Sequence, residues 1–171
     1  MLRNSGLSLA AWLVLIPFSR ADAPEAAIQK DIVFGKGGDV ELKLDLAQPP
    51  KGGPFPLVVC VHGGAWQFGH RSAHHRTIRL LARHGYVAAS VQYRLTPKYR
   101  FPAQIEDVKC AVRFLRANAK KYKIDPERVG ALGDSAGFVI YSTMRHFRGE
   151  YEEHCLEHRC SVEDEVVAAS A

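Results

Sequence analysis

The sequence lacks the features that define several other classes of protein. Its 23 Lys and Arg residues are spread along the chain and form no basic stripe with interleaved aromatic residues, so we expect no nucleic-acid binding despite a formal net charge of +5. The chain has no internal repeat, no low-complexity tract and no apolar run of the roughly 20 residues that a membrane-spanning helix needs. Its 171 residues are enough for one domain with a hydrophobic core and too few for two ordinary ones.

Cysteine is also scarce, and the 4 cysteines form no compact disulfide framework. Cys60 falls within an apolar strand pattern and Cys110 within a helical one. Cysteines in such places usually behave as small buried hydrophobic residues, so we expect no bridge between these two.

The first residues have the plan of a secretory signal peptide. Arg3 precedes a short apolar run at residues 7–18, and small residues follow around Ala21. The run is shorter than a membrane-spanning helix, which leaves an ordinary buried or anchoring helix as the alternative. We expect residues 1–21 to be removed as a signal peptide and the mature chain to be secreted or periplasmic, with no membrane span after removal.

After residue 30, hydrophobic patterns alternate between the periods of strands and helices. Residues 40–46 alternate Val or Leu with charged residues, as a half-exposed strand does, and residues 57–61 are continuously apolar, as in a strand covered on both faces. Strands are predicted at residues 31–34, 40–46, 57–61, 86–91 and 128–132, and helices at residues 72–84 and 102–122. The predicted fold class is α/β, with a mostly parallel sheet, helices on both faces and an antiparallel edge hairpin at the start.

Two motifs follow predicted strands. The first, residues 62–66 (HGGAW), comes directly after the strand that ends at Val61. Glycines at the carboxyl end of a parallel strand let backbone N–H groups point into the crevice where ligands bind. Such donors can stabilise the oxyanion that forms when a carbonyl group is attacked.

The second motif, residues 133–137 (GDSAG), has the G-x-S-x-G pattern of a nucleophile elbow between a strand and a helix. In such a turn Ser135 is held in a strained conformation with its hydroxyl exposed, and the N–H of Ala136 is a second oxyanion donor. Either motif alone is weak, because G-x-S-x-G occurs by chance and Gly-Gly after a strand is more often a plain turn. In this order, each after a strand, the two motifs form a strong joint signal.

The segments that carry these motifs resemble the α/β-hydrolase superfamily. They are VVCVHGGAWQFGHR at residues 58–71 and GYVAASVQYRLTPKYRFPAQIEDVKCAVRFLRANAKKYKIDPERVGALGDSAG at residues 85–137. Both look like the carboxylesterase and lipase branch with an HGG-type oxyanion loop, which includes acetyl-xylan and feruloyl esterases. The resemblance is continuous over residues 30–137.

The resemblance implies a role for each matching residue. Ser135 matches the nucleophile, and Gly63, Gly64 and Ala136 match the oxyanion hole. The residues that match non-catalytic positions are His62, which shapes the loop, Asp134, which is not the triad acid, and Arg94 and Asp107, which are structural. The histidines just after the loop are interpreted as a solvated helix start: His70, His74 and His75.

The later part of the chain departs from the family pattern. The triad of the family runs in the order Ser, then Asp or Glu, then His, and complete domains of this kind have roughly 250 residues. No acid-then-histidine segment is recognisable after Ser135, and residues 138–140 (FVI) make a poor helix start. We therefore expect residues 30–137 to form the N-terminal part of an α/β-hydrolase domain. Residues 138–171 are predicted to be a divergent tail, out of frame or foreign.

Histidines of this tail leave two alternatives open. A triad is defined by geometry, so His146, His154 or His158 could supply the base, although exposed tail histidines are the simpler interpretation. The string EHCLEHRC at residues 153–160 could bind zinc, but its spacing fits no common template. We expect no metal site and no cofactor.

The resemblance implies a serine hydrolase that acts on carboxylic esters through an acyl-enzyme, with a small-molecule or carbohydrate-linked ester as substrate. Without a triad acid and histidine, the oxyanion hole and binding alone would leave a residual rate on the order of 10³ over water. We therefore expect weak or no turnover for the chain as it stands. The alternative is a non-catalytic binding protein, or a non-functional fragment, on a hydrolase scaffold.

Overall fold

A twisted sheet in the order β1-β2-β4-β3-β5 organises residues 26–146, which are the residues that the structure, a computed structural model, describes. Its strands are β1 (Ile28–Gly37), β2 (Val40–Ala47), β3 (Phe55–Val61), β4 (Val87–Val91) and β5 (Ile124–Gly133). β1 pairs with β2 and β2 with β4 in antiparallel fashion, whereas β3 pairs in parallel with both β4 and β5. The expected antiparallel hairpin at the start is confirmed, and the described sheet is mixed, because β2 also pairs with β4 in antiparallel fashion.

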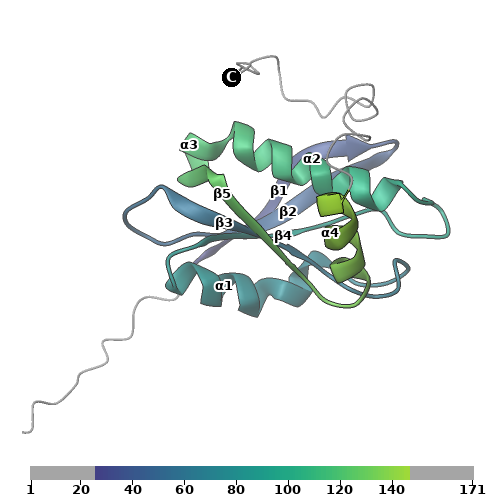
Figure 1. Cartoon of the computed structure of the whole chain (residues 1–171), viewed down its shortest axis with the longest axis horizontal. Helices are drawn as coiled ribbons and strands as arrows, with labels where there is room; N and C mark the ends of the chain where they lie inside the picture. Colours follow the sequence, from purple (N-terminus) through teal and green to yellow (C-terminus); the bar gives the residue numbers. More distant parts are fainter. Residues whose placement is uncertain (1–25, 147–171) are drawn as a thin grey trace, which may run out of the picture.

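Helices cover both faces of this sheet (Figure 1). The short 3-10 helix η1 (Arg71–His74) leads into α1 (His75–Arg83), which lies below the sheet in the view of Figure 1. Above it lie α2 (Ala103–Ala117) and α3 (Ala119–Tyr122), and α4 (Ala136–His146) packs against α2 and β5. The predicted α/β architecture, with helices on both faces, is therefore confirmed.

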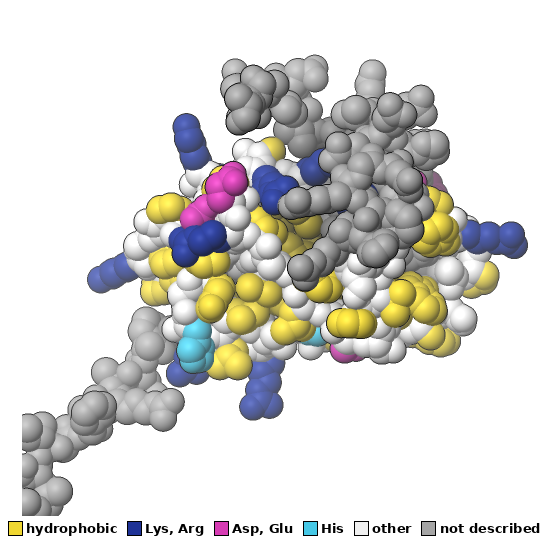
Figure 2. Space-filling view, in the orientation of Figure 1, with side chains coloured by type: hydrophobic (Ala, Val, Ile, Leu, Met, Phe, Trp, Pro, Cys, Tyr) yellow, Lys and Arg dark blue, Asp and Glu magenta, His cyan; other side chains and the backbone are white. Residues whose placement is uncertain are grey.

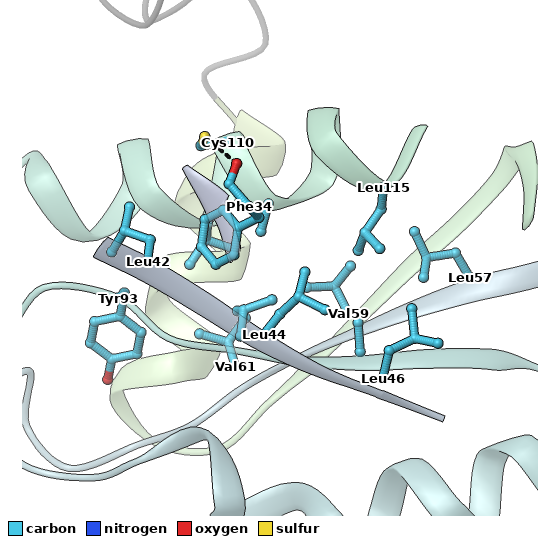
Figure 3. Packing of buried hydrophobic residues seen from close by; sticks show 14 of the residues in the cluster. Phe34, Leu42, Leu44, Leu46, Leu57, Val59, Val61, Tyr93, Cys110 and Leu115 are labelled. Atoms are coloured by element: carbon cyan, nitrogen blue, oxygen red, sulfur yellow. Dashed lines mark hydrogen bonds between the residues drawn. The ribbon is translucent and has the colours of Figure 1, made fainter. Parts of the chain in front are cut away.

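The main core lies between the sheet and α2 (Figure 3). Alternate residues of β2 point to this side, where Leu42, Leu44 and Leu46 are at most 1% exposed. Neighbouring strands and α2 complete this core with Phe34, Leu57, Val59, Val61 and Leu115. On the opposite face Cys60 packs with Ile78 of α1 in a second cluster. β3 is thus buried on both sides, which explains its continuous apolar sequence.

The predicted helix at residues 102–122 is interrupted at Asn118. The backbone N–H of Asn118 and its side-chain Nδ2 both donate to the Phe114 carbonyl oxygen, at 3.0 and 2.8 Å. This side chain competes with the continuing helix for the same acceptor, so α2 ends and the short α3 follows.

The strand after α3 starts earlier than its sequence indicates. Asp125 pairs with Pro56 and Val129 with Leu57, so residues 126–128 bulge out of the ladder. The Asp125-Pro126 pair therefore interrupts β5 from within, because proline has no N–H to donate to a ladder.

Residues 138–140 were expected to make a poor helix start, and this prediction is wrong, because they lie within α4. The N–H of Gly137 donates to the Asp134 carbonyl oxygen at 2.8 Å, and that of Val139 donates to the Ser135 carbonyl oxygen at 3.3 Å. Ile140 is then buried to 2% exposure in the core. Burial of one face outweighs the small helix penalty of β-branched residues.

The Cys60 thiol is free and buried, and burial raises its pKa to about 12. The expectation that Cys60 and Cys110 form no bridge with each other is therefore confirmed. Cys110 is buried in the main core, as predicted, and it is also disulfide-bonded. Its sulfur lies 3.8 Å from the Phe34 carbonyl oxygen, at the top of the core in Figure 3.

On the face drawn in Figure 2, Lys and Arg side chains project singly around the outline, with hydrophobic side chains spread between them. Large hydrophobic side chains are exposed on β5 and α4, where Leu132 is 39%, Phe138 57% and Val139 46% exposed. Within residues 26–146, no helix is long and apolar enough to span a membrane. The predicted signal peptide, residues 1–21, lies outside the described residues.

Candidate active site at the carboxyl ends of β3 and β5

The two sequence motifs meet at one edge of the sheet. β3 ends at Val61, directly before residues 62–66, and β5 ends at Gly133, two residues before Ser135. These strands are parallel neighbours, and Val61 pairs with Gly133. The carboxyl ends of adjacent parallel strands are where open α/β sheets bind ligands.

Ser135 sits in a strained turn between β5 and α4. Its φ angle is +48°, in the left-handed region that residues other than glycine rarely adopt, and its side chain is exposed. Strain of this kind clusters at active sites, because the surrounding structure must hold it in place. The conformation is the one that a nucleophile elbow requires.

Gly133 and Gly137, the glycines on either side of Ser135, allow α4 to approach the sheet closely. A Cβ atom on Gly137 would lie 2.1 Å from the Val61 carbonyl oxygen, and one on Gly133 would lie 2.5 Å from the carbonyl carbon of Gly137. Both contacts are with backbone atoms, which cannot rotate away. No larger residue fits at either position without moving β3 or α4.

The HGG loop is a tight turn that also requires glycine. The φ angle of Gly64 is +113°, and its carbonyl oxygen accepts hydrogen bonds from the N–H groups of Gln67 and Phe68, both at 2.9 Å. A Cβ on Gly64 would lie 2.3 Å from the Phe68 carbonyl oxygen. The loop is tied to the segment after β4, because the Thr96 N–H donates to the Trp66 carbonyl oxygen at 2.9 Å.

His62 is buried beneath this loop and supports it. Its Nδ1 donates to the Gly63 carbonyl oxygen at 2.8 Å, and its ring stacks on Tyr93 with centroids 4.3 Å apart. The Tyr93 hydroxyl donates to the His62 carbonyl oxygen at 2.8 Å, and burial raises the pKa of Tyr93 to about 12. Burial lowers the pKa of His62, although its bond to Gly63 acts in the opposite direction. These contacts fit the loop-shaping role that the resemblance implies for His62.

Asp134 joins the elbow to the loop, a contact that sequence reasoning missed. The Gly63 N–H donates to Asp134 Oδ1 at 3.2 Å, and His74 Nε2 lies 3.2 Å from the same oxygen. The histidine contact lacks hydrogen-bond geometry, so Nε2 has no hydrogen-bond partner among the described residues. Gly63 thus uses its N–H within the protein, whereas the Ala136 N–H belongs to the first turn of α4, where helices leave N–H groups unpaired.

The three histidines after the loop do not share one environment. His70 is exposed and caps η1 by accepting the Ser72 N–H at 3.2 Å, which agrees with a solvated helix start. His74, in contrast, is 8% exposed and faces Asp134, so the prediction of a solvated residue is wrong for it. The 3-10 turn of η1 directs the His74 ring inward. The sequence predicted an α-helix from residue 72, and this geometry could not be inferred from it.

A buried ionic network fixes η1 and α1 to the hairpin. Arg71 Nε donates to Asp45 Oδ1 at 2.9 Å, and its guanidinium also pairs with Asp31. His75 Nε2 lies 2.7 Å from the second Asp45 oxygen. Burial acts to raise the pKa of Asp45, but these hydrogen bonds outweigh it and lower the pKa. No sequence pattern indicated this network, because Asp31 and Asp45 lie far from Arg71 along the chain.

Arg94 and Asp107 form an ion pair that joins two segments of the chain, as expected of structural residues. The Arg94 backbone N–H and Nε both donate to Asp107, at 2.7 and 2.9 Å, and Nη2 reaches Glu106 at 3.2 Å. Burial alone would lower the pKa of Arg94, but the hydrogen bonds to Asp107 raise it. The pair anchors α2 to the segment that follows β4.

Within residues 26–146, no three His, Cys, Asp or Glu side chains are placed to hold a metal ion. The zinc alternative at residues 153–160, and the base candidates His154 and His158, lie outside the described residues. The backbone of His146 ends α4, and its side chain is likewise not described.

Comparison with known proteins places this geometry among esterases. The model of the family described as BD-FAE matches residues 44–168. The esterase Est2 of Thermogutta terrifontis is 28% identical with a TM-score of 0.63, over 71% of this chain and 44% of its own. A bacterial heroin esterase is 30% identical with a TM-score of 0.67, over 75% of this chain and 42% of its own.

A further structure is that of Thermogutta terrifontis esterase 2 phosphonylated by sarin, which is 27% identical with a TM-score of 0.63, over 71% of this chain and 45% of its own. The chain thus spans less than half the length of these esterases. The family match covers well over half of the chain. The protein therefore belongs to the BD-FAE family, and it has the α/β-hydrolase fold of carboxylic ester hydrolases.

Proposed function

We propose that the chain carries the nucleophile half of a serine esterase site, with Ser135 as the nucleophile. The observation that carries this proposal is the strained, exposed turn at Ser135, placed beside the HGG loop on the neighbouring strand. The family membership supports ester hydrolysis as the reaction class. The substrate would be a small-molecule or carbohydrate-linked carboxylic ester.

In the proposed reaction, Ser135 Oγ attacks the carbonyl carbon and the carbonyl oxygen becomes an oxyanion. Backbone N–H groups of Gly64 and Ala136 would stabilise this charge, and each such donor is typically worth about 3 to 4 kcal/mol of barrier. Collapse of the tetrahedral species expels the alcohol and leaves an acyl-serine. Water then attacks the acyl group, the acid is released and the Ser135 hydroxyl is restored.

The proton of Ser135 needs an acceptor, and two of the described histidines are occupied otherwise. His62 is buried and bonded to Gly63, and His75 is bonded to Asp45. Acylation would therefore depend on water or on another basic side chain, which includes the side chains that the structure does not describe. Turnover would be slow unless such a group supplies the base, because a triad histidine contributes most of the rate beyond the oxyanion hole.

The proposal is tested with p-nitrophenyl acetate, by following p-nitrophenol release at high protein concentration. We expect release that scales with protein concentration and that Ser135→Ala abolishes, while Ser142→Ala, a half-buried serine on α4, leaves it unchanged. Release that survives in Ser135→Ala would come from other surface groups and would overturn the assignment.

We also propose that residues 1–21 direct export. The support is the order of a basic residue, a short apolar run and small residues at the expected cleavage site. N-terminal sequencing of the chain after expression with an intact export pathway tests this proposal. A first residue of Asp22 in the exported fraction supports it, and an intact N-terminus on a retained protein overturns it.

A further inference from the structure

We propose that Asp134 is a positioning residue that holds the oxyanion loop at both of its ends. This inference rests on the proposed function, because it concerns the loop that faces Ser135. Asp134 lies in the turn before Ser135, so its backbone moves with the nucleophile elbow. Its carboxylate reaches across to a loop that follows a different strand.

The first contact is at the start of the loop. Asp134 Oδ1 accepts the Gly63 N–H at 3.2 Å. Its Oδ2 would lie 2.4 Å from a Cβ atom on Gly63, so the carboxylate packs directly against the glycine backbone. Glycine at this position is what allows the acid to approach so closely.

The second contact is just beyond the end of the loop. The loop connects the end of β3 to the start of η1 and so comprises residues 62–70. His74 belongs to η1, and its Nε2 lies 3.2 Å from the same Asp134 oxygen. The His74 side chain is buried, and Nε2 has no hydrogen bond within the described part of the chain. When Nε2 carries a proton, the ring and the Asp134 carboxylate attract each other by charge across this distance, even without hydrogen-bond geometry.

Between these two contacts lies Gly64, whose N–H is a proposed oxyanion donor. The turn around Gly64 is closed by its own hydrogen bonds to Gln67 and Phe68, so it moves as a unit. The direction of the Gly64 N–H relative to Ser135 therefore depends on how the two ends of the loop are held. One carboxylate that holds both ends, and that is covalently next to Ser135, fixes the donor against the nucleophile.

Asp134 acts through the loop and touches no reacting atom. Its backbone carbonyl oxygen also accepts the Gly137 N–H at 2.8 Å, which ties the first turn of α4 to the same residue. The side chain is 63% exposed, so a substitution removes the contacts without opening a cavity in the core. This exposure makes the test practicable.

The experiment compares Asp134→Ala with Asp134→Asn in the full chain. Asparagine keeps an oxygen that accepts the Gly63 N–H, whereas alanine removes it. Glu127→Gln is the matched control, because Glu127 is an exposed acid on β5. Two readouts are used, which are amide hydrogen exchange at Gly63 by NMR and the labelling of Ser135 by a fluorophosphonate.

In the labelling reaction, Ser135 Oγ forms a bond to phosphorus, the P–F bond breaks, fluoride leaves and the serine proton passes to water. Labelling at several probe concentrations separates the limiting rate from the half-saturating concentration. We expect Asp134→Ala to lower the limiting rate by about 10- to 100-fold, as a displaced oxyanion donor does, with little change in half-saturation. Asp134→Asn should recover most of the rate, and Glu127→Gln should match the wild type.

In the exchange readout, we expect Gly63 to exchange faster in Asp134→Ala and at the wild-type rate in Asp134→Asn. Labelling of Asp134→Ala as fast as wild type or faster would show that the acid does not position the loop, and would overturn the inference. Labelling of Asp134→Asn as slow as Asp134→Ala would overturn it as well. If Ser135 is unlabelled even in wild type, the proposed function fails, and the exchange at Gly63 alone decides whether Asp134 holds the loop.

Discussion

At the scale of single residues, positions 133 and 137, on either side of the Ser135 turn, leave room for nothing larger than glycine. A Cβ on Gly137 would lie 2.1 Å from the Val61 carbonyl oxygen and 2.8 Å from that of His62. We expect Gly137→Ala to lower the free energy of unfolding by about 1 to 3 kcal/mol, because β3 or α4 must move to admit the methyl group. Urea denaturation followed by circular dichroism measures the change.

The control for this prediction is Gly130→Ala. Gly130 also lies in β5, but a Cβ there would have its nearest neighbour, the Leu57 carbonyl oxygen, at 3.9 Å. We expect a change smaller than about 1 kcal/mol for this variant. Equal effects at the two positions would contradict the close approach of α4 to β3.

His62 gives a prediction about pH. Burial lowers its pKa in the folded protein below the value of 6.5 that applies to the unfolded chain. As the pH falls below 6.5, the unfolded chain binds a proton at His62 that the folded chain resists, so stability is lost. We expect the free energy of unfolding to fall between pH 7.5 and pH 5.5, and this fall to shrink in His62→Gln.

His84→Gln is the matched variant for the pH experiment, because His84 is exposed at the end of α1. It should keep the pH dependence of the wild type. An unchanged pH dependence in His62→Gln would mean that His62 takes up its proton equally well in the folded protein. Urea denaturation at each pH provides the measurement.

The sequence could predict residues whose chemistry is local, and it missed those that depend on distant neighbours. The Ser135 turn follows from glycines within two residues of it, so a short motif is sufficient. The contact of Asp134 with Gly63 joins residues 71 positions apart, and no periodic pattern reports the direction of one side chain. The inward direction of His74 was missed for the same reason.

At the scale of elements, α4 shows how tertiary contacts decide between competing local preferences. Ile140 is 2% exposed and packs in the main core, whereas Phe138 is 57% exposed. We expect Ile140→Ala to lower the free energy of unfolding by about 2 to 5 kcal/mol, and Phe138→Ala to change it by no more than about 0.5 kcal/mol. Chemical denaturation of both variants tests this difference.

If Phe138→Ala proved as costly as Ile140→Ala, the face that α4 buries would be assigned wrongly. The sequence misled here because Phe138, Val139 and Ile140 disfavour helix locally, by a few tenths of a kcal/mol each on helix-propensity scales. The turn at Ser135 and the burial of Ile140 stabilise α4 by more than this penalty. At Asn118 the opposite error occurred. The apolar spacing continues through this residue and predicted one long helix, but the Asn118 side chain ends α2.

At the scale of the whole molecule, β5 forms one border of the described sheet. Within residues 26–146 it pairs with β3 alone, and Leu132 beside this border is 39% exposed. An unpaired strand edge with apolar side chains promotes association between copies. We expect self-association that increases with concentration, and we expect Leu132→Lys to reduce it, as measured by analytical ultracentrifugation.

Leu80→Lys serves as the comparison, because Leu80 is 53% exposed on α1, away from β5. It introduces the same charge and should leave association unchanged. A monomeric wild type at all concentrations, or equal effects of the two lysines, would contradict the role of this border.

The overall architecture was predictable because it depends on patterns repeated over many residues. The period-2 pattern of β2 and the continuous apolar run of β3 both indicate which side chains are buried. Strands that alternate with helices along the chain imply parallel pairing. The boundary of the hydrolase domain at Gly137 stays a prediction. Nothing in a local pattern shows which strands flank β5, since neighbours in a sheet need not be neighbours in sequence.

The central claim is that Ser135 is the nucleophile of an esterase-type site. The most direct measurement is to incubate the folded full chain with a fluorophosphonate, digest it and locate the adduct by tandem mass spectrometry. The account predicts phosphonylation at Ser135 and no adduct in Ser135→Ala. An adduct on a different residue, or none under conditions that label a reference esterase, would contradict it.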